Sequence, residues 1–211
     1  MQDFWKESLV VIILFSIFIF FNQQFDTKLL KNVDIKPFSE PTQEIIQNGD
    51  KFEINIDGVQ AKITPIATYK VYGRVLAQHY MSPKYPYSPI VPFDVAIGWK
   101  DLATKESFRY VKIVQQKRAS YWITSWGTPY NCKQIQSMYS NNHLIPANKN
   151  IYNVIKKLKR KDIVYIEGYL VNAEILKNGQ IENINTSLSR EDAKCEVIYV
   201  TRIVTKKGDF Q

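Results

Sequence analysis

The stretch Phe52–Ile63, FEINIDGVQAKI, decides the fold class of this chain, because apolar and polar residues alternate on both sides of Asp57-Gly58. A period of two is the pattern of a β-strand with one buried face. Asp-Gly between two such runs is among the strongest short-range signals for a hairpin. The sequence therefore predicts two antiparallel strands joined by a tight turn.

Strand-forming residues continue from this hairpin to the end of the chain. Six further segments are rich in β-branched and aromatic residues and predict strands: Tyr69–Tyr80, Val95–Leu102, Tyr110–Trp126, Ile163–Val171, Ile181–Ser187 and Cys195–Thr205. Asn178-Gly179 predicts a second hairpin turn. The segment Ser82–Pro92 carries four prolines, so it predicts an irregular surface loop.

One segment, Ala147–Lys161, has a helical period instead. Its apolar residues recur three and four positions apart and form one stripe: Ile151, Val154, Ile155 and Leu158. Asn148 or Asn150 can cap the start of this helix. Its last turn is basic, which complements the negative end of the helix dipole.

These elements predict a mainly β (α+β) domain with one amphipathic helix. Because an open twisted sheet must close or be covered, we expect a small antiparallel barrel or sandwich. The order of strands, amphipathic helix and further strands resembles that of a barrel of the oligonucleotide/oligosaccharide-binding (OB) type.

Near the amino terminus, the apolar run Leu9–Phe21, LVVIILFSIFIFF, is interrupted only by Ser16. As a helix it spans about 20 Å, and apolar flanking residues extend it towards the ~30 Å hydrocarbon layer. A cleaved signal peptide would need small residues after the run, where Phe20–Gln23 stands instead. A buried globular helix would show a polar stripe. The sequence therefore predicts an uncleaved transmembrane anchor.

Four regions follow from these assignments: an anchor at 1–25, a polar stalk at 26–50, a β-rich domain at 51–205 and a polar tail at 206–211. Within the stalk, the sequence predicts a short helix around Thr42–Gln47. Lysines after the anchor favour a cytoplasmic domain by the positive-inside rule. We expect an extracytoplasmic domain instead, since a short head before a lone anchor commonly stays inside.

The formal net charge of +8 is unevenly distributed, because residues 1–50 carry −3 and the remainder carries +11. The basic end of the predicted helix, with the aromatic ring of Trp99, predicts a binding surface for anionic partners: Lys156, Lys157, Lys159, Arg160 and Lys161. Nucleic acid, anionic lipid and an anionic envelope polymer are all compatible with it. The alternative is a solvated helix face that serves the dipole.

Catalytic candidates are few. His143 lies in an Asn-rich segment that we expect to be a loop, and it could act as a general base. Arg190 could clamp a phosphate or an oxyanion, with Asp192 close to it in sequence. The alternative is that His143 braces the helix start and that Arg190 pairs with an acid in a strand connection. The sequence predicts no cofactor and no metal site, since it contains no close-spaced pair of ligands.

Cys132 and Cys195 predict one disulfide, which suits an extracytoplasmic domain; free thiols, or a catalytic or metal-binding thiol, are the alternatives. We therefore expect a membrane-anchored envelope protein whose domain binds a partner protein or an anionic polymer. A tethered hydrolase that uses His143 with Arg190 is the second hypothesis. A tethered OB-like nucleic-acid binder is the third.

Overall fold

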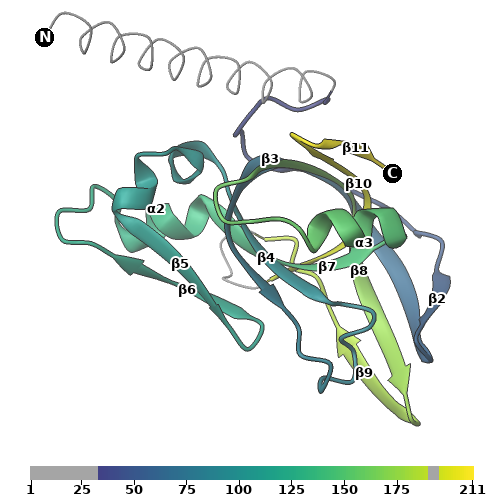
Figure 1. Cartoon of the computed structure of the whole chain (residues 1–211). Helices are drawn as coiled ribbons and strands as arrows, with labels where there is room; N and C mark the ends of the chain where they lie inside the picture. Colours follow the sequence, from purple (N-terminus) through teal and green to yellow (C-terminus); the bar gives the residue numbers. More distant parts are fainter. Residues whose placement is uncertain (1–32, 190–194) are drawn as a thin grey trace, which may run out of the picture.

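The computed structural model of the chain describes residues 33–189 and 195–211 (Figure 1). The predicted anchor at 1–25 lies outside the described residues. Within the described part of the chain, no helix is long and apolar enough to cross a membrane.

The described chain is mainly β, as the sequence predicts. Its strands are β1 Thr42–Ile45, β2 Phe52–Ile56, β3 Val59–Tyr80, β4 Phe93–Gly98, β5 Val111–Gln116, β6 Ala119–Thr124, β7 Tyr139–Pro146, β8 Ile163–Lys177, β9 Gln180–Ile184, β10 Glu196–Thr205 and β11 Gly208–Phe210. The α-helices are α2 Cys132–Ser137 and α3 Lys149–Ile155, and two short 3-10 helices are η2 Lys100–Ala103 and η3 Ser107–Arg109.

The hairpin predicted for Phe52–Ile63 is confirmed. Strand β2 pairs antiparallel with β3, with Phe52 opposite Ile63 and Ile56 opposite Val59. Asp57 and Gly58 both adopt positive φ, 52° and 77°, as the tight turn requires. The second predicted turn joins β8 to β9 through Asn178 and Gly179, also at positive φ.

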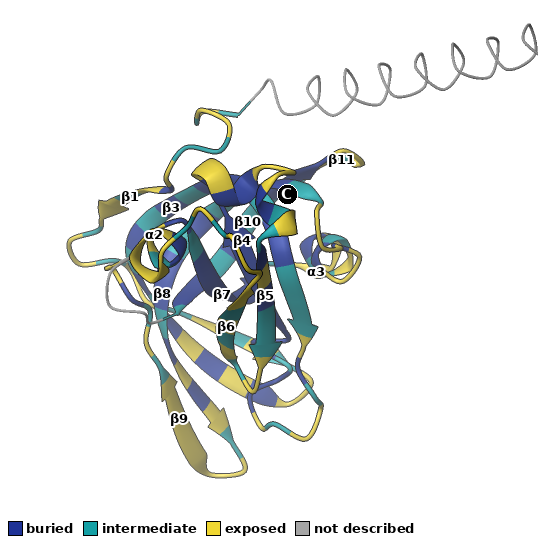
Figure 2. Ribbon diagram, turned by 90° about the vertical axis from the view of Figure 1, so that its left-hand side faces the viewer, coloured by how far each residue is buried: buried dark blue, intermediate teal, exposed yellow. Residues whose placement is uncertain are grey.

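Five strands pair in a closed cycle, in which the last strand also pairs with the first. Strand β3 pairs with β4, β4 with β7, β7 with β10, β10 with β8, and β8 with β3 again. Only β7 and β10 run parallel in this order. All five strands contribute to one buried apolar cluster, onto which α3 packs: the strands give, for example, Val71, Val95, Leu144, Ile166 and Ile198. Figure 2 shows this buried interior in dark blue.

A segment between β4 and β7 forms a second layer. It contains η2, η3, the two-stranded sheet of β5 and β6, and α2. Its apolar residues, such as Val111, Ile113 and Ile135, pack with Leu76 and Ala96 of the main sheet. This layer brings the β5–β6 hairpin near the outer face of β4 and β7.

Three details differ from the sequence expectation. Thr42–Ile45 forms strand β1 and no helix, because it pairs with Ala67–Lys70 of β3. Helix α3 ends at Ile155, six residues early, because Lys161 adopts φ 81° and its backbone N–H donates to Val75 of β3, which directs the chain into β8. The tail at 206–211 contains β11, which pairs with β10.

Candidate functional site

The outer face of β4 and β7 carries a buried acid–histidine pair. Asp94 lies directly opposite His143 in the sheet register, and both side chains point away from the apolar interior that Phe93 and Leu144 face. His143 Nδ1 donates a hydrogen bond to Asp94 Oδ1 over 2.5 Å. Asp94 is 1% exposed and His143 is 7% exposed. His143 therefore belongs to a strand and not to the loop that the sequence predicts.

Arg118 reaches this pair from the tip of the β5–β6 hairpin. Lys117 and Arg118 form the two-residue turn at φ 48° and 68°. Such positive φ values favour glycine or asparagine, and long side chains adopt them at an energetic cost. The guanidinium stacks on the Tyr87 ring, 4.6 Å from its centre, and one of its nitrogens lies 4.0 Å from Asp94 Oδ1.

Neighbouring polar groups connect the hairpin to the sheet. Gln115 Nε2 donates to Asn141 Oδ1 over 2.7 Å, and Asn141 Nδ2 donates to the backbone carbonyl of Arg118 over 3.1 Å. The same amide donates to Cys195 Sγ, whose thiol donates weakly to that Arg118 carbonyl. These bonds fix the hairpin tip above β7 and β10.

Several polar atoms at this site are buried without a hydrogen-bond partner among the described residues. They are Asp94 Oδ2, Gln115 Oε1 and both terminal nitrogens of Arg118. Each unsatisfied buried group costs about 1–3 kcal/mol, and charged groups cost more. These groups come from three elements, β4, β5 and the positive-φ turn, and a bound ligand, ion or water is what usually satisfies such groups. Together these atoms comprise hydrogen-bond donors on Arg118 and acceptors on Asp94 and Gln115.

The disulfide prediction was wrong, because both cysteines are free thiols. Cys132 is exposed at the start of α2, whereas Cys195 is half-buried and hydrogen-bonded beneath the hairpin tip. One argument for an extracytoplasmic domain is thereby lost. Burial raises the pKa of the Cys195 thiol, an effect that the Asn141 hydrogen bond partly offsets.

We expect the two thiols to alkylate at clearly different rates. Iodoacetamide reacts with the thiolate, so a raised pKa lowers the reactive fraction of Cys195 at any pH below that pKa. At pH 8, Cys195 should react at least about ten times more slowly than Cys132. Mass spectrometry of timed samples measures both rates, and Cys132→Ser gives the Cys195 rate alone. Equal rates would show that the hairpin tip does not shield Cys195.

The partners that the sequence assigns to His143 are not tested, because Arg190 and Asp192 lie outside the described residues. Within the described chain, Asp94 contacts His143 and Arg118 lies 4.0 Å from Asp94. Sequence reasoning missed both, although an aspartate inside the apolar run Phe93–Trp99 was a signal. An acid at such a position is costly to bury unless it is paired.

The residues of the predicted basic surface do not form one surface in the structure. Trp99 is fully buried and its indole N–H donates to the Ser137 carbonyl, so it offers no stacking face. Lys156 lies over the Tyr152 ring, and Arg160 lies over Phe108. Lys159 is exposed. Lys157 and Lys161 line a pocket with basic residues from other elements.

No three His, Cys, Asp or Glu side chains gather as a metal site anywhere in residues 33–189 and 195–211. Comparison with protein families, curated proteins and solved structures finds no match to this chain.

Proposed function

We propose that the chain is a single-pass membrane protein of the cell envelope whose β-rich domain binds a partner and does not catalyse a reaction. The apolar run Leu9–Phe21 supports the membrane part. The unsatisfied hydrogen-bonding groups of Arg118 and Asp94 carry the binding part. An extracytoplasmic position of the domain is part of this proposal.

The order of the strand pairings supports an OB-type barrel. Five strands pair in a closed order, and α3 lies between the third and fourth of them in sequence, β7 and β8. Barrels of this type bind oligosaccharides or oligonucleotides on the face of their second and third strands. Strands β4 and β7 take these positions, and they carry Asp94 and His143.

Binding fits the contacts of His143 better than nucleophilic catalysis does. The described residues place no hydroxyl or thiol in hydrogen-bonding contact with its ring, and its contact is with Asp94. The Cys195 thiol is directed at the Arg118 carbonyl instead. A triad would need a nucleophile on the ring nitrogen that faces away from Asp94.

The ligand class follows from the unsatisfied atoms. Arg118 offers donors, whereas Asp94 Oδ2 and Gln115 Oε1 offer acceptors. An N-acetylated glycan matches all three, because its acetamido carbonyl accepts a hydrogen bond while its N–H and hydroxyl groups donate. The hairpin tip at 115–120 belongs to none of the apolar clusters; hydrogen bonds and the stack of Arg118 on Tyr87 hold it, and the proposal requires it to open for the glycan.

We expect Arg118→Ala to weaken glycan binding by about 10- to 100-fold, since it removes charged hydrogen bonds worth about 1.5–3 kcal/mol. Isothermal titration of the full chain in an uncharged detergent, with an N-acetylglucosamine oligosaccharide, measures the loss. Lys117→Ala is the matched control, because it changes the neighbouring residue of the same turn and should retain binding. No binding by the unaltered chain, or equal loss in both variants, would refute the proposal.

A further inference from the structure

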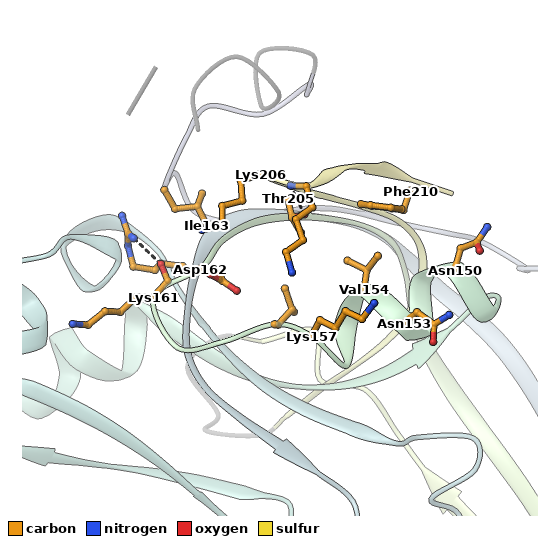
Figure 3. A pocket seen from close by; sticks show the side chains of 13 residues that line it. Asn150, Asn153, Val154, Lys157, Lys161, Asp162, Ile163, Thr205, Lys206 and Phe210 are labelled. Carbon is orange, nitrogen blue, oxygen red and sulfur yellow. Dashed lines mark hydrogen bonds between the residues drawn. The ribbon is translucent and has the colours of Figure 1, made fainter. Parts of the chain in front are cut away.

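A second site lies at another part of the domain. A pocket of about 270 Å³ opens between the turn that follows α3 and the hairpin of β10 and β11 (Figure 3). Apolar side chains of Val154, Leu158 and Phe210 form part of its wall. Five basic residues and one acidic residue also line it: Arg74, Lys157, Lys161, Lys206, Lys207 and Asp162.

The positive charge of this pocket is not neutralised within the described chain. No described carboxylate lies within 4 Å of the amino groups of Lys157, Lys206 or Lys207. The Asp162 carboxylate accepts from the backbone N–H of Lys159 over 2.8 Å. Three lysine ammonium groups are therefore available to an anion.

Arg74 adds a charge that is held in place. Its side chain donates to the carbonyls of Ala103 and Lys161, so the guanidinium is fixed before any ligand arrives. Lys161 contributes less, because its ammonium lies over the Phe108 ring, and Figure 3 shows its side chain pointing away from Lys157. A fixed guanidinium with mobile ammonium groups around it is a common arrangement for phosphate.

The pocket lies where the described chain begins. Val33, Ile35 and Phe38 pack against the same buried cluster as Ile163, and Ile163 also lines the pocket. The Phe38 ring lies 5.6 Å beneath the Arg74 guanidinium. Residues between the end of the apolar run, Phe21, and Val33 can span at most about 40 Å. The pocket therefore lies at the end of the domain that the chain ties to the membrane.

We propose that this pocket binds the phosphate of an anionic phospholipid headgroup in the membrane that anchors the chain. This inference rests on the anchor of the proposed function and is independent of the glycan site. Basic residues near an anionic leaflet each strengthen binding about five-fold. The three unpaired lysines should together contribute about 100-fold.

The test uses the full chain in an uncharged detergent, titrated with short-chain phosphatidylglycerol, while native mass spectrometry counts bound lipid. We expect phosphatidylglycerol to bind at least ten times more tightly than phosphatidylcholine. A triple variant in which glutamine replaces each of Lys157, Lys206 and Lys207 should bind phosphatidylglycerol about 100-fold more weakly. The control replaces the exposed residues Lys105, Lys112 and Lys133 with glutamine, which lowers the net charge equally.

Any one of the following results would overturn the inference. Equal loss in both triple variants would indicate unspecific electrostatic attraction. Inorganic phosphate that binds as tightly as the lipid would make free phosphate the ligand, and an oligonucleotide that binds in place of lipid would make it a nucleic-acid site. If alkaline carbonate without detergent extracted the chain from membranes, the predicted anchor would not hold the chain in the bilayer. Glycan binding by the triple variant then reports separately on the proposed function.

Discussion

Asp94→Ala is expected to lower the free energy of unfolding by about 3–5 kcal/mol, the usual cost of removing one partner from a buried ion pair. Asp94 is 1% exposed, accepts from His143 and lies 4.0 Å from the Arg118 guanidinium. Without the Asp94 carboxylate, the largely buried Arg118 guanidinium has no described carboxylate within 4 Å. Urea denaturation of the full chain in detergent, followed by tryptophan fluorescence, measures the change.

Arg118→Ala separates stability from binding at the same site. Arg118→Ala leaves Asp94 its hydrogen bond from His143, and the terminal nitrogens of Arg118 are unsatisfied, so the substitution should change the free energy of unfolding by less than about 1 kcal/mol. In the double variant, part of the Asp94→Ala loss should return, since no buried cation is left behind. If Arg118→Ala were as destabilising as Asp94→Ala, Arg118 would be a structural residue and not a ligand-binding one.

Gly168→Ala is expected to cost at least about 3 kcal/mol, above the usual range for overpacking. Gly168 pairs with Tyr69 of β3 on one side and with Val200 of β10 on the other. A Cβ at this position would overlap the backbone carbonyl oxygen of Tyr199, and a backbone atom cannot rotate away. The substitution therefore strains the closed order of strands where β8 joins β10.

Gly179→Ala is the matched control for this experiment. Gly179 lies in the β8–β9 turn at φ 77°, where an added Cβ would have no described atom within 4 Å beyond those of its chain neighbours. Its replacement should cost only about 1 kcal/mol of backbone strain. Similar urea midpoints for the two variants would contradict the close approach of β8 and β10.

Local pattern was sufficient for many elements. The alternation in Phe52–Ile63 predicted β2, the turn and the start of β3, and Asn148 caps α3 by accepting from the N–H groups of Asn150 and Ile151. These features depend on residues only a few positions apart, so the sequence alone shows their spacing. Thr42–Ile45 is the exception, because the edge of β3 decides its strand conformation.

The candidate site could not be predicted in the same way. Asp94 and His143 are 49 positions apart, and only the register of β4 and β7 brings them together. Arg118 comes from a hairpin that folds over this face, and Lys206 joins Lys157 across a pocket although the sequence places it in a tail.

By itself the sequence determined the β-rich class, its main hairpins, the capped helix and the uneven distribution of charge, since each follows from local periodicity or composition. The tertiary structure alone decided which residues are partners: it paired His143 with Asp94, buried Trp99 in the core and left both cysteines free. Pairing across strands depends on register and on packing between distant segments, and neither is encoded in any short stretch of the chain.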